Sequence, residues 1–289
     1  MNYSFPRYLA AKKTVDDRAL NHFVWETLIS TLHSGPLRIL EIGAGIGTMI
    51  ERLLDRGLLR QAHYMALDAQ PENIAVANER LRSRGFITTP NGLELGESCV
   101  FLVTADLFEF LLQAYQPWDL LIAHAFLDLV DIPSTLPRLL KLMKPGGLGY
   151  FTVNFDGGTF FEPAVDPELE DSIQNLYHQT MDTRQVDGRP SGDSHSGRHL
   201  FTHLRAAGAQ ILAAGASDWV VFPGHQGYPG DEAYFLHFII NTIDLALHSQ
   251  PSLDAAQFQH WVAARHAQIE RKELVYITHQ LDFLVKQAE

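Results

Sequence analysis

Residues 37–48 read LRILEIGAGIGT, and this stretch decides how the rest of the sequence is interpreted. An apolar run typical of a buried strand leads into Gly43, Gly45 and Gly47, and a helix is predicted to follow. Glycines at a strand-to-helix turn let a ligand approach the main chain, and the first turn of the helix offers free N–H groups. The carboxylate of Glu41, two residues before the first glycine, suits a ligand with a cationic group better than a pyrophosphate.

The spacing of the glycines separates this loop from two common nucleotide-binding motifs. A dinucleotide-binding loop has the pattern G-x-G-x-x-G, and Thr48 stands where that pattern needs its third glycine. A phosphate-binding loop of the GxxxxGK type is absent. A glycine-rich turn after a strand does not identify the ligand by itself, so the surrounding segments have to be considered.

Short apolar runs alternate with amphipathic segments of helical length between residues 37 and 155. Such alternation predicts βαβ units and a parallel sheet with helices on both faces, a doubly wound α/β fold. Apolar runs without alternating polarity, such as 119–123, are typical of strands covered on both sides. Strands are predicted at 38–43, 63–68, 99–105, 119–124 and 148–154, and helices near 46–57, 71–84, 106–115 and 133–143.

The flanking segments predict additions to this sheet. Residues 1–36 are interpreted as an N-terminal helical cap, and residues 37–245 as the α/β domain. Within that domain, residues 156–200 are rich in Asp, Gly, Pro, Ser and His and predict a long loop or lid with a helix near 166–181. Amphipathic patterns predict helices at 233–248 and 254–286, so residues 246–289 are interpreted as a C-terminal helical segment completing the cap.

Composition restricts the possible partners. The chain has 289 residues, 46% of them apolar and 19% charged, and a formal charge of −12. Nucleic-acid binding depends on clustered Lys and Arg, so no nucleic-acid partner is expected. Cys99 is the single cysteine, which excludes an internal disulfide and a Cys-rich metal site. No signal peptide or membrane span is expected, and the sequence predicts a cytoplasmic monomer or homodimer that binds a small molecule.

Three acidic residues end successive predicted strands. They are Glu41, Asp68 and Asp106. Ligands of open parallel sheets bind beyond the carboxyl ends of the strands, so these carboxylates are expected to surround one crevice. A carboxylate after the second strand suits two ribose hydroxyls, because it can accept two hydrogen bonds. Each acid alone could equally cap the helix that follows it.

The order ILEIGAGIG, ALDAQPENIAVA, TADL, WDLLIAHAFLDLV and LLKLMKPGGLGYFTVN resembles class I S-adenosylmethionine-dependent methyltransferases. The resemblance covers about residues 37–155 and implies a seven-stranded, mostly parallel sheet. It also implies S-adenosyl-L-methionine as the cofactor, with Asp68 on the ribose and Asp106 and Leu107 at the adenine. The full set of cofactor-binding residues that it implies is Glu41, Gly43, Ala44, Gly45, Gly47, Asp68, Ala69, Asp106, Leu107, Ala123 and His124.

Methyl transfer from a sulfonium needs proximity, orientation and, for a protonated acceptor, a base. The region just past the fourth predicted strand would face the methyl group, and it carries His124 and Asp128 as candidate catalytic residues. A histidine can accept a proton near neutral pH. The alternative is that His124 only packs and positions the main chain.

Substrate contacts are sought in the flanking segments. The stretch 182–199 holds Arg184, His195 and Arg198, which could close over an acidic or polar acceptor because guanidinium groups match carboxylates. A solvated loop that caps the next helix is the alternative. Tyr8 and Arg18 in the N-terminal segment and Asn154 after the fifth strand complete the substrate candidates.

No metal is predicted. His195, His199 and His203 fall on one helical face, but no nearby Cys or Glu completes a zinc site.

Other functions remain open on the sequence alone. An aminopropyl transferase resembling spermidine synthase would need a further acidic pair near the fourth strand, which Asp128 and Asp131 match only loosely. A non-catalytic S-adenosylmethionine-binding protein is a third possibility. An NAD-linked dehydrogenase ranks last because of the glycine spacing. The absence of an NPPY-type tetrapeptide after the fourth strand disfavours nucleic-acid methylation and leaves small molecules as acceptors.

Overall fold

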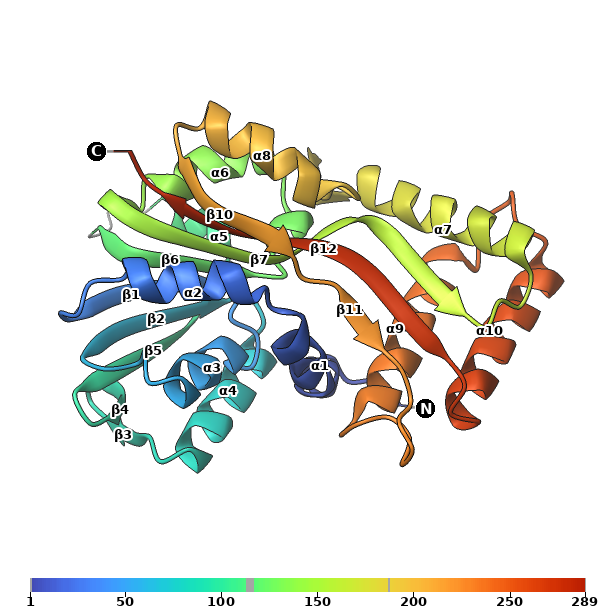
Figure 1. Cartoon of the computed structure of the whole chain (residues 1–289), viewed down its shortest axis with the longest axis horizontal. Coiled ribbons are helices and arrows are strands. Elements are labelled where there is room, and N and C mark those ends of the chain that lie inside the picture. Colours follow the sequence, from blue (N-terminus) through green and yellow to red (C-terminus); the bar gives the residue numbers. More distant parts are fainter. Residues whose placement is uncertain (1, 113–116, 187, 289) are drawn as a thin grey trace.

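The computed structural model describes residues 2–112, 117–186 and 188–288. Its main element is a mixed, ten-stranded sheet with helices on both faces (Figure 1). The strand path is β10-β12-β7-β6-β1-β2-β5-β4-β3, and β11 pairs with β12. The strands are β1 (Leu37–Ile42), β2 (Ala62–Asp68), β3 (Ile87–Thr89), β4 (Gly92–Leu95), β5 (Ser98–Thr104), β6 (Trp118–His124), β7 (Met143–Glu162), β10 (Gln210–Ala216), β11 (Trp219–Val221) and β12 (Val275–Lys286).

The predicted parallel block is confirmed. Strands β5, β2, β1, β6 and β7 are parallel neighbours, and β12 runs antiparallel between β7 and β10. These seven strands match the predicted sheet. The hairpin β3–β4 and the short β11 extend it to ten, because β4 and β11 pair antiparallel with β5 and β12.

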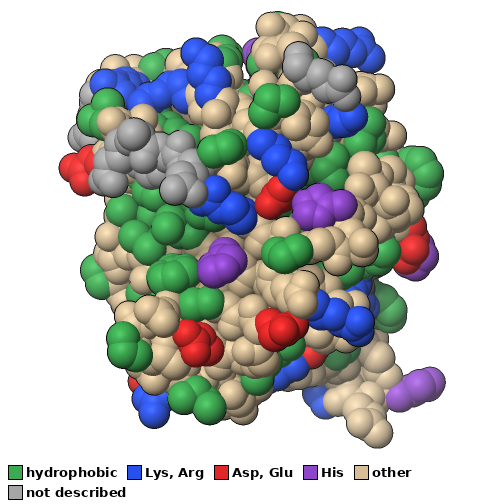
Figure 2. All heavy atoms as spheres, turned by 90° about the vertical axis from the view of Figure 1, so that its left-hand side faces the viewer, with side chains coloured by type: hydrophobic (Ala, Val, Ile, Leu, Met, Phe, Trp, Pro, Cys, Tyr) green, Lys and Arg blue, Asp and Glu red, His purple; other side chains and the backbone are tan. Residues whose placement is uncertain are grey.

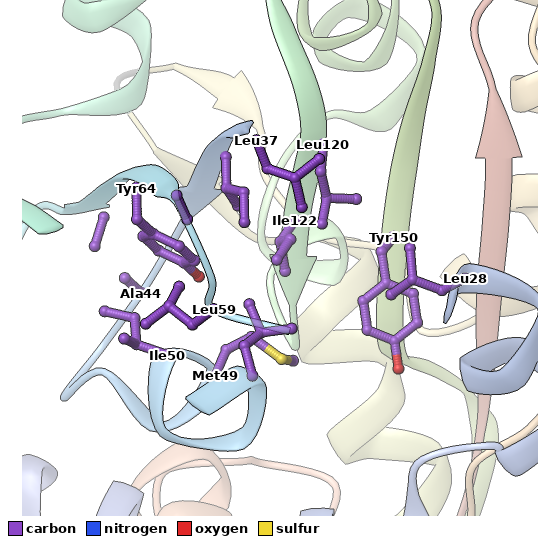
Figure 3. Packing of buried hydrophobic residues seen from close by; sticks show 14 of the residues in the cluster. Leu28, Leu37, Ala44, Met49, Ile50, Leu59, Tyr64, Leu120, Ile122 and Tyr150 are labelled. Atoms are coloured by element: carbon purple, nitrogen blue, oxygen red, sulfur yellow. The ribbon is translucent and has the colours of Figure 1, made fainter. Parts of the chain in front are cut away.

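Helices cover the two faces of the sheet with separate hydrophobic cores. On one face lie α2 (His22–Thr31), α3 (Thr48–Asp55) and α4 (Pro71–Ser83), and on the other lie α5 (Leu107–Phe110), α6 (Ile132–Leu140) and α8 (Ser196–Ala206). Figure 3 shows the first core, in which Tyr64 of β2 lies close to Ala44, Ile50 and Leu59. Of the predicted helix at 106–115, residues 107–110 form α5, and residues 113–115 lie outside the described ranges.

The remaining helices form the cap. They are α1 (Phe5–Ala19), α7 (Pro167–Asp182), α9 (Glu232–Leu247) and α10 (Ala255–Glu270). Figure 1 shows α7, α9 and α10 gathered around the ends of β7 and β12 that extend beyond the parallel block. A third hydrophobic cluster, which includes Val15, Ile173, Phe235 and Trp261, joins these helices to the sheet.

The prediction of a C-terminal helix at 254–286 is wrong for its second half. Helix α10 ends at Glu270, and residues 275–286 form β12 in the interior of the sheet. Apolar residues recur there at Leu274, Ile277, Leu281 and Leu284, a spacing that fits a helix as well as a strand. The C-terminal segment therefore completes the α/β sheet in addition to the cap.

The predicted long loop at 156–200 is also largely structured. Strand β7 continues to Glu162, α7 matches the predicted helix, and α8 begins at Ser196. Between α7 and α8, β8 (Gln185–Val186) pairs with β9 (Arg189–Pro190). The irregular part of the segment is thus limited to short connections.

Two surface properties bear on partners. No helix in the described ranges has the length and apolar character needed to cross a membrane. On the face shown in Figure 2, Lys and Arg side chains occur singly and in small groups among acidic and apolar ones.

Candidate active site

The glycine loop requires glycine for backbone and for steric reasons. Gly43, Gly45 and Gly47 have φ values of 67°, 54° and 79°, a region that side chains disfavour. A Cβ on Gly43 would lie 2.5 Å from Phe126, and one on Gly45 would lie 3.0 Å from Leu9 of α1. The loop is therefore packed closely between α1 and the segment after β6, and α3 starts directly behind it.

This loop forms one wall of a cavity of about 1470 Å³. The cavity runs from the carboxyl ends of β1, β2 and β5 to the underside of the cap. Most of the predicted cofactor-binding residues line it, namely Glu41, Gly43, Ala44, Gly45, Asp68, Ala69, Asp106, Leu107 and His124. Gly47 and Ala123 are not among the lining residues: a Cβ on Gly47 would face Ala77, and Ala123 is buried in the second core.

The Asp68 carboxylate accepts three hydrogen bonds from within the protein. Its Oδ2 accepts a hydrogen bond from the Gly45 amide (2.8 Å), and its Oδ1 accepts from the Gln70 amide (2.8 Å) and from Asn73 Nδ2 (3.0 Å). A carboxylate offers about four acceptor positions. Asp68 thus fixes the glycine loop and keeps about one position for a ligand, fewer than the two expected from the sequence.

Asp106 serves as a helix cap. Its Oδ1 accepts from the amides of Phe108 (2.7 Å) and Glu109 (3.2 Å) at the start of α5. Asp106 also lines the cavity, so its role as a helix cap is compatible with the predicted contact to a ligand.

Glu41 is buried at the bottom of the cavity. The Tyr64 hydroxyl donates to Glu41 Oε2 across 2.6 Å. Burial raises the pKa of Glu41 to about 8, although the hydrogen bond from Tyr64 and the charge of Arg52 oppose the rise. A cation next to this carboxyl would stabilise its ionised form.

His124 belongs to a buried network that anchors α1. Its Nε2 lies 3.0 Å from Asp16 Oδ2, and its Nδ1 lies 2.7 Å from Thr152 Oγ1. Nε2 also lies 3.3 Å from Arg52 Nη1. Burial lowers the pKa of His124 to about 4 despite the nearby Asp16. Both ring nitrogens are therefore occupied, which disfavours the predicted role of His124 as a base.

Asp16 has four polar neighbours. Besides His124, Trp219 Nε1 donates to its Oδ1 (2.9 Å), and Lys12 Nζ lies 3.0 Å from its Oδ2. Burial opposes ionisation, but Lys12, His124 and Arg52 together keep the pKa of Asp16 below its usual range. Asp16 is thus an ionised residue that joins α1 to the sheet.

Asp128 lies in the turn Leu127–Leu129 after β6 and lines the same cavity. Its Oδ1 is buried and has no hydrogen-bond partner within the described ranges. Burial raises its pKa, and a hydrogen bond from its own main-chain amide and the positive charge of Arg184 partly offset the rise. A buried carboxyl oxygen without a donor is suited to accept a proton from a ligand.

The structure divides the predicted substrate residues into two groups. Tyr8 and Arg184 line the cavity. Arg18, Asn154, His195 and Arg198 do not, and all four contact other protein groups; His195 Nδ1 lies 3.0 Å from Ser194 Oγ. Arg18 donates to Glu232 (2.6 and 2.9 Å), Asn154 to the carbonyls of Phe151 and Leu281, and Arg198 to Asp156 (2.8 Å).

The histidines of α8 do not assemble a metal site. His199 Nδ1 lies 2.7 Å from Asp193 Oδ2, and within the described ranges no cluster of His, Cys, Asp or Glu has the geometry to hold an ion.

Several cavity residues were not identified from the sequence. Asp16, Tyr177 and Asn73 come from helices, and Tyr276, Thr278 and Gln280 from β12. Asp16 lies in the predicted N-terminal cap and Asn73 in a stretch that the family resemblance covers, whereas Tyr177 lies in the predicted lid helix and the three β12 residues in the predicted C-terminal helix. The β12 residues could have been found only by assigning 275–286 as a strand, where they alternate on one side.

The sheet, the glycine loop and the acidic strand ends have the arrangement of a class I S-adenosylmethionine-dependent methyltransferase domain. Residues 40–148 match the family model described as "Methyltransferase domain".

Solved structures of similar fold include methyltransferases. A SAM-dependent methyltransferase from Thiobacillus denitrificans, in complex with S-adenosyl-L-homocysteine, is 12% identical, with a TM-score of 0.50 and coverage of 99% of both chains. A protein provisionally identified as a sarcosine dimethylglycine methyltransferase, from Galdieria sulphuraria, is 14% identical with a TM-score of 0.50, covering 95% of this chain and 86% of that one. At these identities the likeness concerns the fold alone. No curated protein matches in sequence.

Proposed function

We propose that this enzyme methylates a small molecule held between the glycine loop and the helical cap. The observation that carries the proposal is a single cavity that connects Gly43 and Asp68 with Tyr8, Asp128 and Tyr177. Its volume of about 1470 Å³ exceeds the ~300–1,000 Å³ that is usual for the pocket of one small ligand. Such a volume accommodates the cofactor and an acceptor together.

The cofactor end of the cavity suits a zwitterionic nucleoside. When bound, S-adenosylmethionine supplies an electrophilic methyl group. Glu41 would bind the ammonium group of the cofactor. Burial raises the pKa of this carboxyl, and a nearby cation would stabilise its ionised form. The open acceptor position of Asp68 would bind a ribose hydroxyl, and Asp106 and Leu107 would meet the adenine. Gly43 and Gly45 line the cavity, and the methionine part would lie beside their main chain.

We assign different roles to the two candidate catalytic residues. Asp128 would accept the proton of the acceptor, since its Oδ1 is buried without a donor. His124 would act as a positioning residue, because its contact with Asp16 holds α1 over the glycine loop. Tyr8 of α1 and Arg184 after α7 would contact the acceptor.

Calorimetry with S-adenosylhomocysteine tests this function. The wild type should bind it, and Asp68→Asn should lower the affinity by roughly 10- to 100-fold, as expected for one charge-assisted hydrogen bond. Asp55→Asn, a change on the exposed end of α3, is the matched control and should bind like the wild type. NAD should not bind.

Product analysis separates the remaining alternatives. Turnover of S-adenosylmethionine with an acceptor should release S-adenosylhomocysteine. In a second assay, decarboxylated S-adenosylmethionine is supplied in place of S-adenosylmethionine. Release of methylthioadenosine in that assay would indicate aminopropyl transfer. A wild type that does not bind S-adenosylhomocysteine would contradict the proposed function.

A further inference from the structure

The part of the cavity enclosed by α1, α7, β7 and β12 is here called the acceptor chamber. Its walls are mainly aromatic: Phe5, Tyr8, Phe155, Tyr177, Trp219 and Tyr276. The Tyr8 ring is held in place by stacking on Phe238 of α9, with 4.1 Å between the ring centroids. A rigid aromatic wall favours a flat, largely apolar ligand.

One side of β12 adds polar groups to this chamber. Tyr276, Thr278 and Gln280 alternate along the strand and therefore face the same side, and all three line the cavity. Gln280 Nε2 donates to Thr278 Oγ1 across 3.0 Å, which fixes the orientation of the amide. Gln280 Oε1 is then left buried without a partner within the described ranges. A buried acceptor without a donor is unfavourable, so a ligand that donates to it would be stabilised.

Asp128 supplies a second acceptor of the same kind through its unpartnered Oδ1. The chamber thus offers two buried oxygens that need donors from a ligand. A ligand with two O–H or N–H groups would satisfy both.

The charges of the chamber favour a neutral ligand. Lys12 is paired with Asp16 across 3.0 Å. Arg184 lies beside Asp128 and donates to its carbonyl oxygen across 3.0 Å. A cationic ligand group next to the Asp128 carboxylate would be repelled by the Arg184 guanidinium. An anionic ligand group next to Arg184 would be repelled by the Asp128 carboxylate. An uncharged donor avoids both repulsions.

We infer that the acceptor of the proposed methyl transfer is a neutral aromatic alcohol with two hydroxyl groups, one bound by Asp128 and the other by Gln280. This inference rests on the proposed function. The hydroxyl on Asp128 reacts: its proton passes to the carboxylate while the oxygen forms a bond to the methyl carbon. The bond between that carbon and the cofactor sulfur breaks, and its electron pair stays on sulfur. Arg184 stabilises the negative charge that develops on the oxygen.

Binding of matched naphthalene probes to the protein loaded with S-adenosylhomocysteine tests the acceptor class. Dihydroxynaphthalene with hydroxyls on opposite rings should bind roughly tenfold more tightly than naphthol, the usual effect of one added hydrogen bond. Both should bind more tightly than naphthoate, an anion, and naphthylmethylammonium, a cation. If either charged probe binds at least as tightly, or if none of the four binds, the inference is wrong. Neither result affects the proposed function, which is tested separately by S-adenosylhomocysteine binding and by product analysis.

A substitution at Gln280 tests the second contact. Gln280→Met keeps the length of the side chain but removes the acceptor, so it should abolish the preference for dihydroxynaphthalene over naphthol. Affinity for naphthol and for S-adenosylhomocysteine should remain. Gln287→Met is the control, since Gln287 also has a buried unpartnered Oε1 but does not line the cavity. A Gln280→Met protein that keeps the tenfold preference would overturn the role of Gln280.

Discussion

Asp16 Oδ2 and His124 Nε2 lie 3.0 Å apart, although the two residues are separated by 108 positions in the chain. This contact connects α1 to the carboxyl end of β6 and places a neutral histidine beside an ionised carboxylate. It fixes the N-terminal helix directly over the glycine loop. The cofactor end of the cavity therefore depends on a residue pair in which each partner is buried.

The first prediction concerns the stability of this pair in acid. An unfolded histidine binds a proton below about pH 6.5, whereas folded His124 does so only below about pH 4. Between these values the unfolded state binds more protons, so the contribution of His124 to stability is lost as the pH falls. In urea unfolding, the free energy of unfolding of the wild type should be roughly 2 kcal/mol lower at about pH 5 than at about pH 7 because of His124. This decrease should be absent in His124→Gln. Equal pH dependence in both proteins would contradict the assignment of a neutral His124.

The second prediction concerns the protonation of Glu41. With a pKa of about 8, Glu41 is mostly protonated near neutral pH, and a bound ammonium would lower this pKa. Binding of S-adenosylhomocysteine at about pH 7 should therefore release close to one proton from the wild type. Calorimetry in buffers of different ionisation enthalpy measures the release, and Glu41→Gln should abolish it. Binding without proton release would place the ammonium elsewhere.

The third prediction separates Asp128 from its neighbour Asp131. Asp128→Asn should lower turnover by about 10²–10⁴-fold and leave the affinity for S-adenosylhomocysteine nearly unchanged, as for the loss of a general base. Asp131 also lines the cavity, so Asp131→Asn is the matched control and should keep most of the activity. Initial rates with a saturating cofactor concentration provide the comparison. Full activity of Asp128→Asn would remove Asp128 from the mechanism.

The fourth prediction concerns Arg18, which the sequence placed among the substrate residues. Arg18 pairs with Glu232, whose side chain is fully buried. Arg18→Ala would leave this carboxylate without its charged partner and should destabilise the fold by ~1–3 kcal/mol, with turnover unchanged below the unfolding temperature. Arg271→Ala breaks an exposed pair and should cost less than ~1 kcal/mol. Altered acceptor KM in Arg18→Ala would restore a substrate role.

The parts of the site that could be predicted from the sequence are those set by local structure. Glu41, Asp68 and Asp106 lie at or just beyond the carboxyl ends of three parallel strands, and this topology alone brings them to one edge. The glycine loop could also be predicted, because its residues lie close together in the sequence and local structure alone sets its shape.

The acceptor chamber depends instead on segments that meet only after folding. Arg184 lines the cavity, whereas Arg198, fourteen positions further on, pairs with Asp156. Both arginines lie in the same polar stretch of the sequence. They reach different partners because the path of the chain through β8, β9 and α8 places them apart. Likewise, Gln280 lies in a stretch whose apolar spacing fits a helix and a strand equally well. This stretch forms a strand because it pairs with β7 and β10. The local sequence pattern carries no information about these distant partners.

The position of β12 has a consequence for how the protein is made. Residues 275–286 fill the gap between β7 and β10, so those two strands can leave the ribosome long before the strand that joins them. Until then each presents an open edge to other nascent chains, a known route to aggregation. Contacts between segments so distant in the chain also form slowly. Because Tyr276, Thr278 and Gln280 line the cavity, a partly synthesised chain would lack one wall of the chamber.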